Sequence, residues 1–348
     1  MKINAFHSPR QTAHNPAFEI YEHGRQVGYY ESPQRLETIL KGLAESPQIC
    51  LKNCPPANAD HLHCHDKGYL SFLQQAFALW QSESPRDAAE YKAIYPTAHP
   101  ADDMNGNPAG LNAKMGTYIK DLSAPITQGT WEAALASAGC AVAGAADLEL
   151  GARASLALCR PPGHHAGVAN AAGYCYINNA AVAATLLAPT GKVAILDIDY
   201  HAGNGTQQIF YANPQVPVCS IHADPHNEYP YYAGFAHETG TGDGQDAHRN
   251  FPLPAGTQPA AYMVALEKAL GWLSQFTPRY LVLSAGFDTF KQDPLGSFQL
   301  ETATYTQIGA KIRALGIPTL VVLEGGYDIP RLPANLLALV DGLLPGDE

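Results

Sequence analysis

From residue 155 onward, five short apolar runs have the length and composition of buried β-strands, and they lie at residues 155–159, 192–199, 216–223, 279–288 and 317–326. Longer stretches with helical spacing alternate with them, at residues 178–188, 260–276 and 304–316. The first third of the chain adds predicted helices near residues 33–45, 66–81 and 130–149. Apolar strands that alternate with helices are typical of a parallel sheet that is covered on both faces. No linker or repeat interrupts the pattern, so it predicts one α/β domain over residues 1–348, with a mainly parallel β-sheet flanked by helices on both faces.

Residues 82–125 stand apart from this pattern because they show little periodicity. A loop of this length inside a compact domain is usually functional or interfacial. The alternative on composition alone is a surface excursion without a role.

Composition and charge narrow the classes of protein. With 46% hydrophobic and 15% charged residues, the 348-residue chain can bury a sizeable core. A formal net charge of −11 without a cluster of Lys and Arg argues against a nucleic-acid partner and suits a cationic ligand better.

The N-terminus lacks the apolar region of a signal peptide, and no apolar run approaches the roughly 18 residues that span a bilayer, so we expect a cytoplasmic protein without membrane association. The seven cysteines include no C-x-x-C pair, which argues against a disulfide framework and structural zinc.

Polar side chains gather at the ends of the five predicted strands. The segments that follow or end them read RPPGHHAG, DIDYHAGNG, SIHAD, AGFDTFKQDP and EGGYD. In open parallel sheets, ligands bind beyond the carboxyl ends of the strands. We therefore expect these segments to form one site.

Asp197, Asp199 and His201 are spaced two residues apart at the end of the second predicted strand. Their side chains point the same way if the strand persists as far as His201. A single aspartate here would be better explained as a helix N-cap or a buried hydrogen-bonding group. Three such residues on one face, with Asp288 at the end of another strand, favour a transition-metal site whose carboxylates balance a divalent cation.

The adjacent histidines His164 and His165 lie between glycines in PPGHHAG. Beside a metal site, two imidazoles suit a general base and acid that act on the attacking water. Such imidazoles need partners on their far nitrogens, and Asp197 and Asn204 are the nearest candidates in the pattern.

Tyr327 follows two glycines in EGGYD and is one of 18 tyrosines in the chain. A core or surface position is the default for a tyrosine. At the end of an apolar strand, on a permissive backbone, this phenol is placed to donate a hydrogen bond to a developing oxyanion.

These motifs, taken in order, resemble the arginase/deacetylase superfamily and, within it, the acetylpolyamine amidohydrolase branch beside the class II histone deacetylases. The resemblance extends from ESPQRLETIL and GTWEAALASAG through RPPGHHAG and ILDIDYHAGNGTQQIFY to SAGFDTFKQDP and VVLEGGYD. It implies a single deacetylase domain of the arginase/deacetylase fold.

The resemblance also implies roles for particular residues. The zinc ligands, for one Zn²⁺ per subunit with Fe²⁺ as the alternative, are Asp199, His201 and Asp288. The catalytic groups are His164, His165, Tyr327, Asp197 and Asn204, with His165 as the general base and acid and Tyr327 as the group that polarises the acetamide carbonyl. A structural K⁺ is implied at Asp197, Asp199, His201, Ser220 and Ile221. The walls of the substrate tunnel are implied at Tyr174, Tyr229, Gly173 and Leu295.

Two glycines distinguish this chain from the binuclear manganese enzymes of the same superfamily. Those enzymes carry further carboxylates where this chain has Gly203 and Gly286, which predicts a mononuclear centre. Ala202 stands where many relatives have a second histidine.

The substrate-recognising positions also differ from those of relatives. Leu295 occupies the position of the gatekeeper glutamate of the eukaryotic polyamine deacetylase. Bacterial relatives use a long loop that crosses a dimer and contributes an acidic side chain; here the aligned position is Asn112, with Asp102 and Asp103 as nearby candidates.

The sequence thus predicts a zinc-dependent amidohydrolase that removes acetyl groups from N-acetylated polyamines, such as acetylputrescine and acetylcadaverine, or from another acetylated cationic small molecule. We expect a homodimer in which residues 82–125 line the interface and the rim of the active site. The alternative within the same chemistry is a deacetylase of acetyl-lysine in proteins or peptides. A catalytically silent sensor of polyamine or metal is the alternative from another class.

Overall fold

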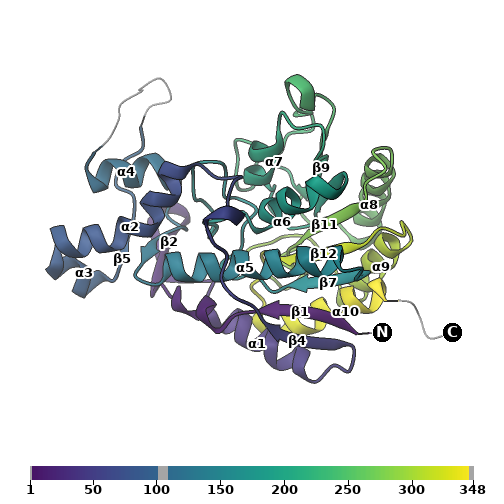
Figure 1. Cartoon of the computed structure of the whole chain (residues 1–348), viewed down its shortest axis with the longest axis horizontal. Helices are drawn as coiled ribbons and strands as arrows, with labels where there is room; N and C mark the ends of the chain where they lie inside the picture. The colour runs from purple at the N-terminus through teal and green to yellow at the C-terminus, as the bar shows by residue number, and fades with distance from the viewer. Residues whose placement is uncertain (1, 101–108, 345–348) are drawn as a thin grey trace.

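The computed structural model describes residues 2–100 and 109–344 of the chain. Its centre is an eight-stranded sheet in which every pair of neighbours is parallel, with the strand order β10-β9-β8-β11-β12-β7-β1-β4 (Figure 1). In chain order, the strands are β1 (Ile3–His7), β4 (Ile49–Asn53), β7 (Ala154–Ala157), β8 (Val193–Asp197), β9 (Val218–Ala223), β10 (His248–Leu253), β11 (Tyr280–Ala285) and β12 (Thr319–Leu323).

Helices cover both faces of this sheet. They are α1 (Pro33–Ala44), α5 (Thr130–Glu149), α6 (Asn179–Leu187), α8 (Pro259–Ser274), α9 (Thr302–Arg313) and α10 (Leu332–Leu343). Leu196 belongs to the buried cluster that includes α1, α8, α9 and α10, whereas its neighbour Ile195 belongs to the cluster that includes α5 and α6. Successive side chains of a buried strand point to opposite faces, so the predicted α/β architecture is confirmed.

The pattern missed three strands of the sheet, β1, β4 and β10. Two of them lie at its edges, and β10 contains Pro252. All three carry partly exposed residues, so none shows the continuous apolar run that identified the central strands.

The expected long loop at 82–125 differs in its local structure from the prediction. It contains α3 (Pro85–Tyr91), the short strand β5 (Ala93–Ile94) and α4 (Leu111–Tyr118), which follow α2 (Lys67–Glu83) at one end of the molecule (Figure 1). β5 pairs with β6 (Ile126–Thr127). Helices of seven or eight residues span too few turns to show a hydrophobic period, although Leu111 and Met115 are buried in a cluster with α2. Asp102 and Asp103 lie outside the described residues.

Two further elements shape the site. The antiparallel hairpin of β2 (Phe18–Tyr21) and β3 (Arg25–Gly28) lies outside the main sheet, and α7 (Asn204–Phe210) follows β8. In the described part of the chain, no helix combines the length and apolar character needed to cross a bilayer.

Candidate active site

Four adjacent strands deliver the predicted chemical groups to one place. β8, β11, β12 and β7 are neighbours in the sheet, and the segments after them carry Asp199, Asp288, Tyr327 and His164 respectively. All four strands are parallel, so their carboxyl ends meet at one edge of the sheet.

The condition that the strand persists to His201 is not met, because β8 ends at Asp197. The carboxylate of Asp197 accepts a hydrogen bond from the Asp199 N–H at 3.0 Å, and the Asp199 carboxylate accepts one from the His201 N–H at 2.9 Å. These side-chain bonds to the backbone turn the chain out of the sheet. The turn nevertheless brings Asp199 and His201 together.

Asp199, His201 and Asp288 form a compact group with the chemistry of a metal centre. Nδ1 of His201 lies 3.0 Å from Oδ2 of Asp288 and 3.3 Å from Oδ1 of Asp199. One ligand atom from each of the three residues lies within 4.8 Å of the others. Asp199 and Asp288 are fully buried, and the imidazole is mostly buried. Two oxygens and one nitrogen at this spacing fit one divalent cation.

The pKa values in this group are shifted because two carboxylates lie side by side, shielded from water. Burial, followed by the charge of Asp199, raises the pKa of Asp288 above its ordinary value. Burial opposes protonation of His201, yet the two carboxylates raise the pKa of its imidazole to about 10. A bound cation would relieve the same repulsion.

The two glycines that stand where the binuclear enzymes have further carboxylates lie close to Asp197 and Asp199. A Cβ atom on Gly286 would lie 1.9 Å from Oδ2 of Asp199, and one on Gly203 would lie 2.2 Å from Oδ2 of Asp197. A side chain at either position would require these carboxylates to shift. A mononuclear centre stays a prediction.

The tandem histidines lie beside the group, with contrasting environments. Nδ1 of His164 is 3.0 Å from Oδ2 of Asp197, and Nδ1 of His165 is 2.7 Å from Oδ1 of Asn204, which are the partners that the sequence predicted. Although burial disfavours its charge, the carboxylates of Asp199 and Asp197 raise the pKa of His164 well above the ordinary value. Burial and the neighbouring His164 lower the pKa of His165 well below it.

Tyr327 lies within reach of the same cavity and is 8% exposed. Burial raises the pKa of its phenol well above the ordinary value, so the hydroxyl remains a donor. Its backbone N–H donates to Asp293 at 2.5 Å, and the Arg35 guanidinium lies 5.0 Å from the centre of its ring.

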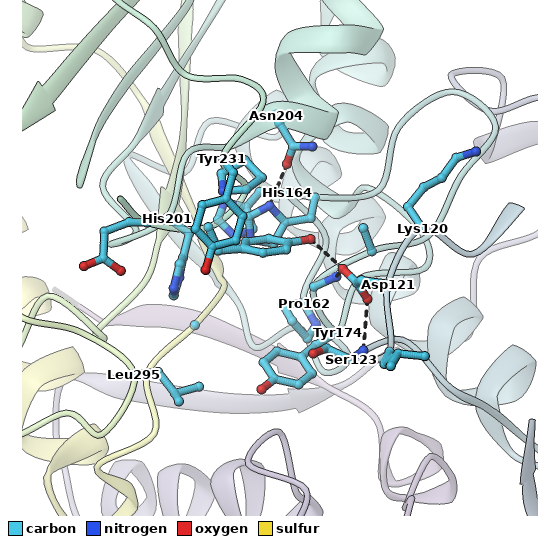
Figure 2. A pocket seen from close by; sticks show the side chains of 18 of the residues that line it. Lys120, Asp121, Ser123, Pro162, His164, Tyr174, His201, Asn204, Tyr231 and Leu295 are labelled. Atoms are coloured by element: carbon cyan, nitrogen blue, oxygen red, sulfur yellow. Dashed lines mark hydrogen bonds between the residues drawn. The ribbon is translucent and has the colours of Figure 1, made fainter. Parts of the chain in front are cut away.

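A cavity of about 680 Å³ opens above these groups (Figure 2). The four predicted tunnel residues all line it; they are Tyr174, Tyr229, Gly173 and Leu295. Both carboxylate oxygens of the buried Glu19 accept from the Tyr174 hydroxyl, at 2.9 and 3.0 Å. Asn112, by contrast, is exposed on α4 and is not among the described residues that line the cavity.

The residues predicted to surround K⁺ also lie together. Ser220 of β9 is the register partner of Asp197 in β8, and its hydroxyl is 2.6 Å from Nδ1 of His222. The side chain of Ile221 is buried in the core, so only its carbonyl oxygen could serve an ion. Potassium binding stays a prediction.

Sequence reasoning missed Glu324, the first residue of EGGYD. Its Oε2 accepts from the backbone N–H groups of Gly163 at 2.7 Å and His164 at 3.1 Å, while Oε1 accepts from the Ser284 hydroxyl at 3.1 Å. Burial raises its pKa to about 7. A buried glutamate directly after an apolar strand was the available signal.

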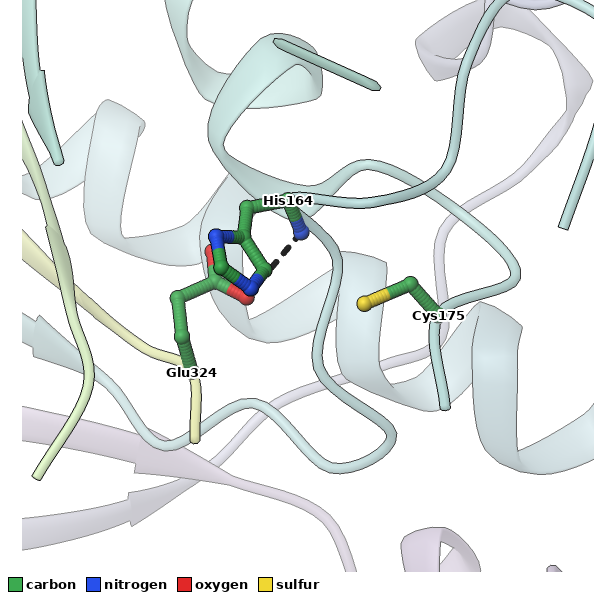
Figure 3. Close-up of side chains that lie close together, drawn as sticks. All are labelled: His164, Cys175 and Glu324. Carbon is green, nitrogen blue, oxygen red and sulfur yellow. Dashed lines mark hydrogen bonds between the residues drawn. The ribbon is translucent and has the colours of Figure 1, made fainter. Parts of the chain in front are cut away.

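Glu324 also lies close to His164 and Cys175 (Figure 3), at the spacing of metal ligands. Both carboxylate oxygens already accept hydrogen bonds, and Sγ of Cys175 is 3.3 Å from the Gly173 carbonyl oxygen. A metal here would displace these bonds. The group is therefore better explained as a brace that holds the histidine segment against the end of β12.

The comparisons with known proteins agree with this geometry. Residues 29–343 match the family model of the histone deacetylase domain. The chain belongs to the histone deacetylase family. It is 40% identical to the acetylpolyamine amidohydrolase of Mycoplana ramosa over 338 residues, and this aligned region covers 94% of this chain and 96% of that protein. It is 39% identical over 326 residues to acetylpolyamine amidohydrolase 1 of Pseudomonas aeruginosa, with 92% of each chain covered.

A solved structure extends the family likeness to the fold. The crystal structure of the acetylpolyamine aminohydrolase from Burkholderia pseudomallei matches with a TM-score of 0.93 and 36% identity, over 98% of both chains. The resemblance read from the motifs is therefore confirmed, and it covers most of the chain.

Proposed function

We propose that the protein is a zinc-dependent amidohydrolase that hydrolyses the acetamide of N-acetylated polyamines, of the acetylputrescine and acetylcadaverine type, to free amine and acetate. The observation that carries the proposal is the grouping of Asp199, His201 and Asp288 beside two histidines that keep separate partners. The names of the relatives, which are acetylpolyamine amidohydrolases, support the substrate class.

The donor set fits Zn²⁺, with Fe²⁺ as the alternative, because imidazole and carboxylate ligands suit both ions. Bound at Asp199, His201 and Asp288, the ion would supply a Lewis acid that polarises the carbonyl and makes water nucleophilic at neutral pH. A structural K⁺ near Ser220 is part of the proposal.

His165 is the proposed base. Its Nδ1 faces the carbonyl oxygen of the Asn204 amide and therefore carries the hydrogen, which leaves Nε2 to accept a proton from the attacking water. The same Nε2–H can then donate to the leaving amine nitrogen. His164, hydrogen-bonded to the Asp197 carboxylate, stabilises negative charge beside it.

Tyr327 is the proposed oxyanion donor. The Tyr327→Phe substitution should lower kcat by about 10²–10³-fold, because the loss of one such donor has that effect in other hydrolases. The thermal unfolding temperature of Tyr327→Phe serves as the control for folding. Turnover of acetylputrescine within threefold of the parent enzyme would refute the role.

The test of the substrate is a panel run with defined metal loading. Acetylputrescine, acetylcadaverine and an acetyl-lysine peptide are compared by kcat/KM with the metal-free, zinc-loaded and iron-loaded protein. The proposal expects the two acetylated diamines to exceed the peptide. A peptide preference would favour the protein deacetylase instead, and zinc-loaded protein without turnover of any amide would favour a sensor.

We also propose a homodimer in which residues 82–125 narrow the entrance of the partner's site and exclude bulky protein substrates. The family resemblance supports this arrangement. The measurement is the solution mass by light scattering, and a monomer at assay concentration would contradict it.

A further inference from the structure

Asp121, between α4 and β6, belongs to none of the sequence motifs but lines the cavity. Its Oδ2 accepts a hydrogen bond from the Tyr229 hydroxyl at 2.6 Å and another from the Gly173 N–H at 2.8 Å. Its Oδ1 accepts from the Ser123 N–H at 3.0 Å. Burial and the charge of Asp121 raise the pKa of Tyr229 well above the ordinary value, so the phenol is the donor.

The two groups held by Oδ2 both pack against His165. The Tyr229 ring stands edge-on to the His165 ring, with centroids 4.9 Å apart and planes at 87°. Gly173, with φ +49°, backs onto the same imidazole, since a Cβ there would lie 2.4 Å from Cδ2 of His165 and 3.1 Å from Cε1 of Tyr229. One carboxylate oxygen therefore ties together two walls of the tunnel beside the proposed base.

We propose that Asp121 is a positioning residue that fixes the width of the substrate tunnel, because it clamps Tyr229 and Gly173 together against His165. The inference rests on the proposed function and goes beyond it, because it names the group that makes the tunnel narrow. A tunnel of fixed width admits an unbranched acetylated chain and rejects one that branches next to the amide nitrogen. The clamp also holds both walls against the base, so its loss loosens substrate placement more than it changes the chemical step.

A purely local role for Asp121 would involve only the turn that Oδ1 closes with Ser123. Asp121→Asn separates the two roles. The amide oxygen of Asn can still accept from the Ser123 N–H, but its NH₂ group would face the Gly173 N–H and cannot accept from it. Tyr229→Phe removes the same clamp from the other side and leaves the turn intact.

The experiment compares the parent enzyme with Asp121→Asn, Tyr229→Phe and the double variant. The substrates are acetylputrescine and an acetylated diamine with a methyl branch beside the acetylated nitrogen. We expect the preference for the linear substrate, as a ratio of kcat/KM, to fall by about tenfold in either single variant, with KM for acetylputrescine raised and kcat within threefold, because a hydrogen bond to a charged group is lost. The double variant should be no worse than the singles, since both break one unit.

Asp224→Asn is the matched control. The Asp224 carboxylate closes the same kind of turn, with the His226 N–H at 3.0 Å, and it is not among the described residues that line the cavity. Its substrate preference should equal that of the parent enzyme. An unchanged preference in both Asp121→Asn and Tyr229→Phe would overturn the inference, and Tyr229→Phe decides it alone if Asp121→Asn does not fold.

A second measurement needs no substrate and so separates this inference from the proposed function. Hydrogen exchange of the Gly173 amide should be about tenfold faster or more in Asp121→Asn than in the parent enzyme or Asp224→Asn, because its acceptor is lost. Unchanged exchange at Gly173 would refute the clamp. If the parent enzyme hydrolysed no acetamide, the proposed function would fall and this exchange comparison would still decide the clamp.

Discussion

The molecule buries carboxylates in two regions and balances them in opposite ways. Glu31 is fully buried and lies 2.8 Å from Nη1 of Arg35 and 3.1 Å from Nε of Arg160. Asp199 and Asp288 are equally buried, but among residues 2–100 and 109–344 no lysine or arginine lies within ion-pair distance of them. The chain supplies arginines to the first region, whereas the partners of Asp199 and Asp288 are the imidazoles of His201 and His164. The metal cation that we propose would complete the charge balance there.

The arginines beside Glu31 also hold the segments that carry the chemistry. Arg35 donates to the carbonyl oxygens of Glu324 and Gly326, both at 2.7 Å. These two residues belong to the segment that directly precedes Tyr327. Arg160 donates to the carbonyl of His14 at 2.7 Å and begins the segment that leads to the tandem histidines. The region that is balanced by arginines is therefore scaffold, and the region that is balanced by imidazoles carries the proposed metal ligands and catalytic groups.

The largest expected effect comes from the metal side of this comparison. Asp288→Asn should no longer bind stoichiometric zinc, and its kcat/KM should fall at least about a thousandfold, because the Lewis acid lowers the activation barrier by several kcal/mol. Its metal-free form should be no less stable than the metal-free parent, since the substitution removes a charge that repels Asp199.

Metal content by mass spectrometry and thermal unfolding of the metal-free proteins measure both effects. Zinc should raise the unfolding temperature of the parent enzyme and not that of Asp288→Asn, because only a bound ligand stabilises the folded state. Full zinc content in Asp288→Asn would contradict the assignment of Asp288 as a ligand.

In the region around Glu31, a substitution should change the free energy of unfolding. Glu31→Gln leaves two buried guanidinium groups without their counter-charge and should lower the free energy of unfolding by about 3–5 kcal/mol. Denaturant unfolding of the metal-free protein measures it. A loss below about 1 kcal/mol would show that the hydrogen bonds from the arginines to backbone carbonyls, rather than Glu31, hold this region.

The smallest effect is expected for a Glu-to-Gln substitution in a solvent-exposed ion pair. Glu267 pairs with Lys311 at 2.6 Å on the surface, where the two side chains are 55% and 48% exposed. Glu267→Gln should change the free energy of unfolding by about 0–1 kcal/mol, because solvent screens the pair. A loss as large as that of Glu31→Gln would show that pairing, rather than burial, sets the difference.

The two regions also differ in how far the sequence predicts them. The parallel arrangement brings Asp199, Asp288 and His164 together at strand ends, so apolar runs followed by polar motifs were sufficient to predict that these side chains meet. The Glu31 cluster was missed because nothing in the chain near Glu31 indicates that Arg160 will lie against it. Long-range pairing of this kind depends on tertiary packing, which periodicity does not report.

Asp121 and the end of β8 illustrate the same limit at shorter range. The partner of Asp121 is Tyr229, 108 positions away, and no spacing rule connects them. β8 stops at Asp197 because its own carboxylate binds the following backbone, whereas alternation alone would carry the strand on to His201. Motifs predicted which residues take part, and the hydrogen bonds of the folded chain decide how they are held.

The position of the first strand has a consequence for the order in which the protein can be built. β1 lies between β4 and β7, so it cannot be enclosed until Ser155, 151 positions beyond its partner Asn4, has been synthesised. Arg35 can donate to the carbonyl of Gly326 only after that residue, 291 positions beyond Arg35, has been synthesised. At about 5–20 residues per second, a ribosome spends many seconds between these events. The candidate active site is therefore assembled only after Gly326 and Tyr327 have been synthesised, and a nascent chain that stops before them lacks part of the site.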